Sequence, residues 1–150
     1  MAGTSRRGLR SSLEDKVAEQ LDEAGVDYGY ESITLSFVQP EKARRYTPDF
    51  ILRPKADARL RRRVGKGQGG RDRNGKDNRI YIEVKGKFDS ADRQKMKLVK
   101  QQYPDLDIRF VFGRAHNKIS KRSKTTYAMW ADRNGFPWAD KGVVPSEWIS

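Results

Sequence analysis

The 150-residue sequence predicts an α/β domain, in which a sheet is flanked by helices. Two strand patterns and the helix pattern between them indicate this class. Residues 79–85 and 106–112 each alternate apolar and polar side chains, which is the period of a half-buried strand. Residues 89–104 have the spacing of a capped helix, opened by Asp89 and closed by Pro104. Strand, helix and strand in this order form a crossover unit, so the two strands are expected to be parallel.

One helix and two strands are predicted ahead of this unit. The helix opens at Ser11 or Ser12 and stops at Gly25, and its apolar residues recur on one face. Residues 28–37 alternate in polarity except near Glu31, which predicts a strand with an irregularity. The segments that follow are a predicted polar connector at residues 39–45 and a predicted second strand at residues 46–52.

The last third of the chain predicts a basic loop, a short helix and an apolar tail. The loop covers residues 113–124 and contains the single histidine, His116, which has no Ser, Cys or second His partner in a motif. We therefore expect His116 to contact phosphate or solvent rather than to catalyse. The short helix is capped at residues 125–126 and ends at Gly135, and the apolar tail at 136–149 is expected to pack on the core or on a partner chain. The predicted apolar side of this helix carries Tyr127, Met129 and Trp130.

The composition indicates a polyanionic partner. The formal net charge is +12 and the isoelectric point is near 10.1, which favours nucleic acid. A membrane partner is disfavoured, because the chain has no long apolar run and no basic helix with a strong apolar face. The absence of cysteine excludes disulfides, thiolate metal sites and cysteine catalysis, and it agrees with a reducing, cytoplasmic setting. The first residues are basic but lack an apolar run behind them, so no secretory signal is expected.

The distribution of basic residues along the chain also predicts its domain organisation. Residues 1–10 are expected to form a flexible basic arm, and residues 11–150 a single domain. Within that domain, residues 53–79 contain eleven Lys or Arg and three Asp, a net charge of +8, together with several glycines. This composition predicts an inserted flexible loop that either contacts phosphates or only solubilises the chain. Because only 35% of residues are hydrophobic, an oligomeric interface is a further expected source of burial.

A possible metal site comes from three acidic and basic residues. Glu83 and Lys85 lie two positions apart on the strand at 79–85, so their side chains share one face. Asp49, on the strand predicted upstream, is the candidate for a second carboxylate. Two carboxylates and a backbone carbonyl, here that of Val84, suffice to hold Mg²⁺ against a phosphate, where the ion activates water. Lys85 is then placed to orient that water or to stabilise developing charge, although the same residues also occur on ordinary solvated strand faces.

Glu14 has two interpretations, which depend on the serine that caps the first helix. If Ser11 is the N-cap, Glu14 returns a hydrogen bond as part of a capping box. If Ser12 is the N-cap, Asp15 takes that role and Glu14 is free to reach a metal. The helix pattern alone leaves both interpretations open.

The motif formed by residues 48–49 and 83–85 resembles the catalytic motif of the restriction-endonuclease-like, or PD-(D/E)xK, nucleases. Five blocks between about residues 11 and 149 also resemble, in order and spacing, the endonuclease I family of T7-like phages. That family consists of Holliday-junction resolvases of the same fold. The basic segment 53–78 is the clear departure, because the family has a short turn there. The five blocks are residues 13–17, 46–50, 83–86, 103–109 and 145–149.

The resemblance implies a mixed central sheet flanked by helices and a metal-dependent hydrolysis of DNA phosphodiesters. It implies that Asp49 and Glu83 bind metal and that Lys85 is catalytic. It also implies that Glu14 completes a two-metal site, which favours the functional interpretation of that residue. The implied cofactor is Mg²⁺, for which Mn²⁺ substitutes, and the implied products are 5′-phosphate and 3′-hydroxyl ends.

The resemblance further implies four-way and other branched DNA as the substrate, cut by paired nicks near the branch point. The implied assembly is an intertwined, domain-swapped homodimer, in which Glu14 of one subunit acts with the other site residues of its partner. The bridge between the subunits would lie near residues 40–46, and two sites related by a two-fold axis suit paired nicks. Two alternatives remain: a restriction-like or transposon-end nuclease of the same fold, and a non-catalytic basic architectural protein.

Basic residues in the arm, after the connector and around the basic loop are the candidates for contacts with the DNA backbone. These candidates are Arg6, Arg7, Arg10, Arg44, Arg45, Lys87, Arg93, Arg114, His116, Lys118, Lys121 and Arg122.

Overall fold

The computed structural model describes residues 11–39, 42–53 and 76–150. Its centre is a five-stranded sheet in the order β1 (Tyr28–Tyr30), β4 (Phe50–Leu52), β5 (Ile80–Lys85), β6 (Asp107–Phe112) and β7 (Trp138–Ala139). The pairs β5–β6 and β6–β7 are parallel, whereas β1–β4 and β4–β5 are antiparallel. The predicted α/β class and the mixed sheet are therefore confirmed.

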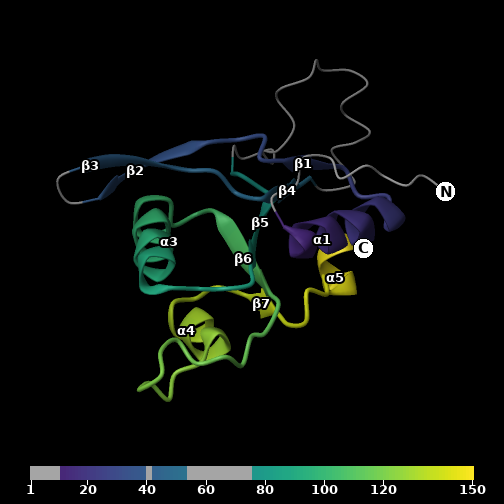
Figure 1. Ribbon diagram of the computed structural model, residues 1–150. Coiled ribbons are helices and arrows are strands. Elements are labelled where there is room, and N and C mark those ends of the chain that lie inside the picture. The colour runs from purple at the N-terminus through teal and green to yellow at the C-terminus, as the bar shows by residue number, and fades with distance from the viewer. Residues whose placement is uncertain (1–10, 40–41, 54–75) are drawn as a thin grey trace.

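Helices cover both faces of this sheet (Figure 1). α1 (Ser12–Glu23) and α5 (Ser146–Ile149) lie on one face, and α3 (Ser90–Gln102) and α4 (Tyr127–Arg133) lie on the other. Alternate residues of β5 enter the two apolar clusters: Ile82 belongs to the cluster that contains Val17 of α1, and Tyr81 belongs to the cluster that contains Met96 of α3. The central strands are therefore buried on both faces, as expected for the parallel part of a sheet.

The predicted crossover unit is confirmed by β5, α3 and β6. Asp89 is the N-cap of α3, and its side chain accepts a hydrogen bond from the amide of Asp92 at 2.8 Å. Met96 and Val99 of the helix are buried against the sheet. The parallel pairing runs along the whole of β5, up to Lys85, so both sequence-predicted residues of this strand lie in a regular ladder.

The predicted strand 28–37 is in fact two strands in different sheets. β1 ends at Tyr30, and Glu31 adopts a left-handed φ of 45°, which turns the chain out of the central sheet. β2 (Leu35–Gln39) then pairs antiparallel with β3 (Lys42–Tyr46), where a polar connector was predicted. The connector prediction was wrong because β3 has no alternation of apolar residues to reveal it; its pairing with β2 makes it a strand. The predicted strand 46–52 is likewise shorter, since β4 begins only after Asp49.

β2 and β3 form a separate two-stranded sheet that extends over α3 (Figure 1). The side-chain amide of Gln102, at the end of α3, donates to the carbonyl of Val38 at 2.5 Å and accepts from its N–H at 2.6 Å. The hydroxyl of Tyr103 donates to the carbonyl of Ser36 at 2.5 Å. The polar groups on the outer edge of β2 are thus bound by α3, which holds the hairpin against the domain.

Most of the sequence predictions for the C-terminal third of the chain are confirmed by the structure. Phe136 and Val144 are buried, and Thr126 caps α4 by accepting the amide of Met129 at 3.1 Å. Trp130 is buried as expected, but Met129 is 39% exposed, so its predicted inward position was wrong. The buried side of this short helix is made instead by positions 127, 128, 130 and 131.

Within the described ranges, no helix is long and apolar enough to cross a membrane. The predicted arm at 1–10 and most of the predicted insertion at 53–79 lie outside those ranges. The last residues of the insertion, 76–79, are described and lead directly into β5.

Candidate active site

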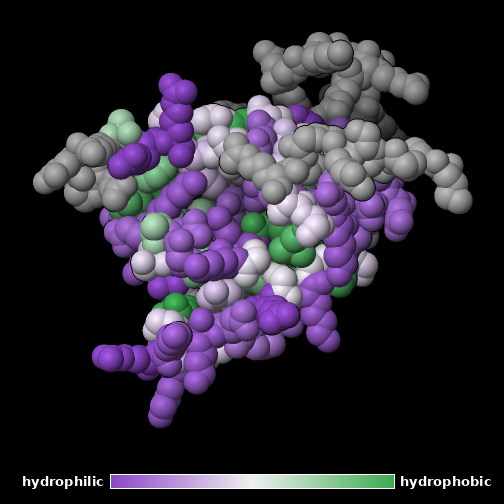
Figure 2. Space-filling view, viewed as in Figure 1, coloured by the Kyte–Doolittle hydropathy of each residue, from purple (hydrophilic) through white to green (hydrophobic). Residues whose placement is uncertain are grey.

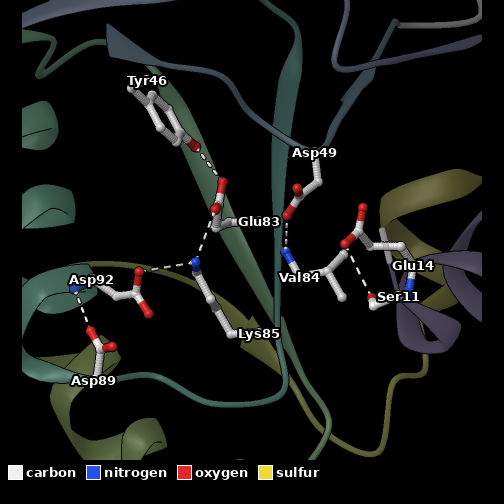
Figure 3. A network of polar contacts seen from close by, with 9 residues as sticks. All are labelled: Ser11, Glu14, Tyr46, Asp49, Glu83, Val84, Lys85, Asp89 and Asp92. Atoms are coloured by element: carbon white, nitrogen blue, oxygen red, sulfur yellow. Dashed lines mark hydrogen bonds and ion pairs between the residues drawn. The ribbon is translucent and has the colours of Figure 1, made fainter. Parts of the chain in front are cut away.

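Asp49 lies at the end of the sheet where α1 and β5 approach each other (Figure 3). Its Oδ2 accepts a hydrogen bond from the amide of Val84 at 2.8 Å. Its backbone carbonyl accepts the amide of Glu31 at 3.0 Å, so both its side chain and its main chain are fixed. Figure 3 shows Asp49 between Glu83 on one side and Glu14 on the other.

Glu83 is almost completely buried, with 4% of its surface exposed. Its two oxygens have different neighbours: Oε2 accepts a hydrogen bond from the hydroxyl of Tyr46 at 2.8 Å, and Oε1 lies 3.5 Å from Nζ of Lys85. Glu83 and Lys85 therefore share one face of β5, as their spacing predicted. Tyr46 was not among the predicted site residues. The sequence placed it at the start of the predicted strand 46–52, and only the pairing of β3 with β2 shows how its hydroxyl is held at Glu83.

Glu14 takes part in the helix cap, and its carboxylate also faces Asp49 (Figure 3); its binding of a metal stays a prediction. Ser11 is the N-cap of α1, and its Oγ accepts the amide of Glu14 at 3.2 Å and donates to Oε1 of the same residue at 3.1 Å. The carboxylate is nevertheless buried, with 7% exposed, and its Oε2 accepts the hydroxyl of Tyr30 at 2.5 Å. A residue in the first turn of a helix thus contributes to the cap and still faces Asp49.

Two of these carboxylates, those of Asp49 and Glu83, have pKa values above the ordinary range. Burial, with added repulsion from Glu83 and Glu14, raises the pKa of Asp49 to about 8, despite the hydrogen bond from Val84. Burial also raises the pKa of Glu83, although Lys85 and Tyr46 oppose the shift. Carboxylates with such raised pKa values are typical of functional sites. Like charges are brought together there, and the chain supplies too few positive side chains to neutralise them.

Glu31 is a site residue that the sequence analysis missed. Carboxylate oxygens of Glu14, Glu31 and Asp49 lie within 4.8 Å of one another, an arrangement that can hold a metal ion. The only signal in the sequence was the break in alternation near Glu31, which coincides with its left-handed backbone. Glu83 does not belong to this group of three, since it lies on the far side of Asp49.

Lys85 is held between two carboxylates. Its Nζ lies 3.5 Å from Oε1 of Glu83 and 3.3 Å from Oδ1 of Asp92, in the first turn of α3. Burial lowers the pKa of Lys85, but the two neighbouring carboxylates outweigh this effect, so its pKa lies above the ordinary value. Lys85 is therefore a cation at neutral pH, suited to orient an anion or a water molecule rather than to accept a proton. Asp92 is a second residue that the sequence analysis missed.

The donor set fits a hard divalent cation. All of its side-chain ligands are carboxylate oxygens, which Mg²⁺ and Ca²⁺ prefer. At least one oxygen of each of Asp49, Glu83 and Glu14 accepts a hydrogen bond within the chain, which orients the group. The donors are the amide of Val84 for Asp49, the hydroxyl of Tyr46 for Glu83 and the hydroxyl of Tyr30 for Glu14.

Comparison with known proteins identifies the family. The family model of phage endonuclease I matches residues 1–56 and 76–150. The chain belongs to the phage endonuclease I family. It is 38% identical to endodeoxyribonuclease 1 of Enterobacteria phage T3 over 142 residues, which cover 95% of this chain and 77% of that protein. It is 36% identical to endonuclease I of Escherichia phage T7 over 155 aligned positions, which cover 99% of this chain and 87% of that protein.

The family match leaves residues 57–75 outside it. These residues fall within the basic segment that the sequence analysis singled out as the departure from the endonuclease I pattern. Both the motif residues at 48–49 and those at 83–85 lie inside the matched ranges.

Most of the predicted DNA contacts in this endonuclease I family member are exposed. The face seen in Figure 2 is largely hydrophilic, including the end of the molecule around α4. Arg93 differs from the others, because its guanidinium donates to the carbonyl of Phe88 at 2.6 Å and to that of Ile119 at 3.4 Å. It therefore ties α3 to the basic loop. The exposed candidates are Arg44, Arg45, Lys87, Arg114, His116, Lys118, Lys121 and Arg122.

His116 has a local structural role beside its exposure. Its ring lies edge-on to Trp138, with the ring centres 5.8 Å apart, and its Nε2 lies 3.8 Å from Oδ2 of Asp140. That His116 is not a catalytic group stays a prediction. Arg6, Arg7 and Arg10 lie outside the described residues.

Proposed function

We propose that this chain is an endodeoxyribonuclease that resolves four-way and other branched DNA by Mg²⁺-dependent hydrolysis, with paired nicks near the branch point. The observation that carries the proposal is the convergence of Asp49, Glu83 and Lys85 at one end of the sheet, with Glu14 of α1 facing Asp49. The names of the T3 and T7 relatives, an endodeoxyribonuclease and an endonuclease, support the reaction class.

The residues have distinct roles in this proposal. Asp49, Glu83 and Glu14 would hold the cation, together with the backbone carbonyl of Val84, and Mn²⁺ would substitute for Mg²⁺. When bound, such a cation lowers the pKa of water and neutralises charge on the phosphate. Lys85, kept protonated by its carboxylate neighbours, stabilises the charge that develops on the phosphate oxygens. Cleavage leaves 5′-phosphate and 3′-hydroxyl ends.

We propose further that the active form is a domain-swapped homodimer. The hairpin of β2 and β3 is the bridge. If it opens, residues 11–39 of each chain pack on residues 42–53 and 76–150 of the other and form the same contacts. Glu14 would then reach Asp49 of the partner chain through the geometry seen here within one chain. Two such sites on a two-fold axis suit the two opposed strands of a junction.

Cleavage of a labelled four-way junction, compared with a linear duplex of the same arms, tests the reaction. We expect symmetric nicks near the branch in Mg²⁺ and none in Ca²⁺, with cleavage lost and junction binding kept in Lys85→Ala. Lys97→Ala is the matched control, because it removes one exposed positive charge from α3 outside the site. Equal cutting of the linear duplex would favour a restriction-like nuclease, and binding without cutting would favour an architectural protein.

Complementation between two inactive variants tests the swap. In a swapped dimer of Glu14→Ala and Lys85→Ala chains, one site carries both substitutions and the other carries neither. We therefore expect mixed, co-refolded dimers to regain single nicks on a junction, although each parent alone is inactive. Without the swap, both sites of the mixed dimer carry one substitution, so continued inactivity of properly mixed dimers would contradict this part of the proposal.

A further inference from the structure

Tyr46 connects the β2–β3 hairpin to the acidic site. It is the last residue of β3, it is paired with Leu35 of β2, and its side chain has no exposed surface. Its hydroxyl donates to Oε2 of Glu83 at 2.8 Å, and Nζ of Lys95 lies 5.4 Å from the centre of its ring. The ring is thus fixed from three directions: by its strand, by a cation on its face and by the carboxylate at its tip.

The two carboxylate oxygens of Glu83 have different partners. Oε2 is occupied by Tyr46, whereas Oε1 faces the ammonium group of Lys85 at 3.5 Å. Because Glu83 is only 4% exposed, little water reaches Oε2 to replace the hydroxyl. A cation that approaches this carboxylate therefore meets Oε1, which it would share with Lys85, whereas one lone pair of Oε2 is already engaged by Tyr46.

The number of available oxygens matters for the choice of cation. Mg²⁺ requires a compact octahedral shell, usually with single oxygens from each carboxylate and several waters. Ca²⁺ takes six to eight oxygens at longer distances and readily binds both oxygens of one carboxylate. A carboxylate whose second oxygen is engaged and fixed by a hydrogen bond favours binding through one oxygen, which suits Mg²⁺ and disfavours the two-oxygen binding that Ca²⁺ readily adopts.

We propose that Tyr46 is a positioning residue that restricts Glu83 to a single metal-binding oxygen and thereby makes the site discriminate in favour of Mg²⁺ over Ca²⁺. The inference rests on the proposed function, in which Glu83 holds a divalent cation. The second attachment of the hairpin, at Gln102 of α3, keeps β2 in place and so supports the position of Tyr46.

The test is the affinity of the full chain for each cation, without DNA, in wild type and in Tyr46→Phe. Calorimetric titrations with Mg²⁺ and with Ca²⁺ give the ratio of the two dissociation constants. Substitutions in the groups that orient metal ligands typically lower metal affinity by 10- to 100-fold, so we expect about a tenfold loss for Mg²⁺. The affinity for Ca²⁺ should fall less or rise, because the second oxygen of Glu83 is released.

Tyr81→Phe is the matched control. Tyr81 is also buried in the same apolar cluster, and its hydroxyl also donates to a carboxylate, but that carboxylate is Asp77 at the opposite end of β5. This variant should leave the ratio of affinities unchanged. A wild type that binds neither cation would contradict the proposed function itself. A wild type that binds Mg²⁺, with an unchanged ratio in folded Tyr46→Phe, would overturn only the present inference.

A measurement on the wild type covers the case in which Tyr46→Phe does not fold. The separation of the carboxylate stretching bands in the infrared differs between one-oxygen and two-oxygen binding. Subtracting the infrared spectrum of Ca²⁺-loaded Glu83→Gln from that of Ca²⁺-loaded wild type isolates the carboxylate bands of Glu83. We expect the one-oxygen pattern, and a two-oxygen pattern would refute the role of Tyr46.

Discussion

The two ends of β5 hold carboxylates in opposite electrostatic surroundings. Just before the strand, Asp77 accepts three hydrogen bonds from Arg79, at 2.8 to 3.0 Å, and a fourth from Tyr81. Burial raises the pKa of Asp77, but the hydrogen bonds from Arg79 and Tyr81 outweigh it and hold the pKa below its ordinary value. The charge of this carboxylate is thus balanced within the chain.

At the other end, Asp49 accepts one hydrogen bond to its side chain and faces the carboxylates of Glu83 and Glu14. Its pKa is raised to about 8, mainly by burial and by Glu83, and the cation of Lys85 does not compensate. The comparison teaches that burial alone does not distinguish a structural from a functional carboxylate. In the proposed function, the distinction is whether the chain supplies the balancing positive charge, as for Asp77, or leaves it to a bound cation, as for Asp49.

The largest expected effect is on cleavage by Asp49→Asn. Replacing a carboxylate that holds the cation should remove about 4 kcal/mol of transition-state stabilisation, which is about 10³-fold in the cleavage rate. The rate is measured on a four-way junction under single-turnover conditions, with Asp77→Asn as the control at the other end of β5. Asp77→Asn should keep its activity at temperatures where it is folded. If Asp49→Asn retained a rate within tenfold of wild type, the two ends would not differ in function.

The next effect is the pH dependence of stability without metal. The pKa of Asp49 is about 8 in the folded chain and about 4 when unfolded, so its contribution to stability is complete below pH 4 and is lost as the pH rises toward 8. Asp49→Asn should therefore gain stability relative to wild type between pH 5 and pH 8, by on the order of 3 kcal/mol. Urea unfolding of both proteins at each pH measures this difference. Excess Mg²⁺ should stabilise wild type at pH 8, and a difference that stays constant with pH would contradict the assignment.

The opposite behaviour is expected for Asp77. Because its pKa is lowered in the folded state, its contribution to stability is present above pH 4 and is lost as the pH falls. Asp77→Ala leaves the donors of Arg79 and Tyr81 without their acceptor and should cost about 2 kcal/mol at pH 7, as measured by urea unfolding. This cost should shrink in acid, and Mg²⁺ should not restore the loss. An Asp77→Ala variant as stable as wild type would contradict the claim that Asp77 is a structural carboxylate.

The smallest effect is expected from Asp92, one of the two carboxylates beside Lys85. Asp92→Asn removes one of them while Glu83 remains, and a partly exposed ion pair contributes about 1 kcal/mol or less. We therefore expect at most about a fivefold fall in the single-turnover rate, with the affinity for Mg²⁺ unchanged. The double variant Lys85→Arg/Asp92→Asn, compared with Lys85→Arg alone, shows whether Asp92 affects the cleavage rate through Lys85. An equal loss from Asp92→Asn in the Lys85→Arg background would indicate a separate role for Asp92.

Elements whose evidence lies in consecutive residues could be predicted from the sequence. The alternation of β5 and β6 and the capped helix between them predicted the crossover unit, because strand and helix periods are properties of consecutive residues. The same local evidence placed Glu83 and Lys85 on one face of β5. Asp49 and Glu14 were identified by motif and resemblance, and the structure brings them together.

The tertiary structure decided what depends on contacts between distant segments. β3 is a strand because β2 pairs with it, and this pairing is invisible in the composition of its basic residues. Tyr46, Glu31 and Asp92 enter the site from three different elements, so no spacing along the chain connects them with Glu83 or Lys85. The pKa of Asp49 was equally beyond the sequence, because it depends on burial and on charges that only folding places beside it.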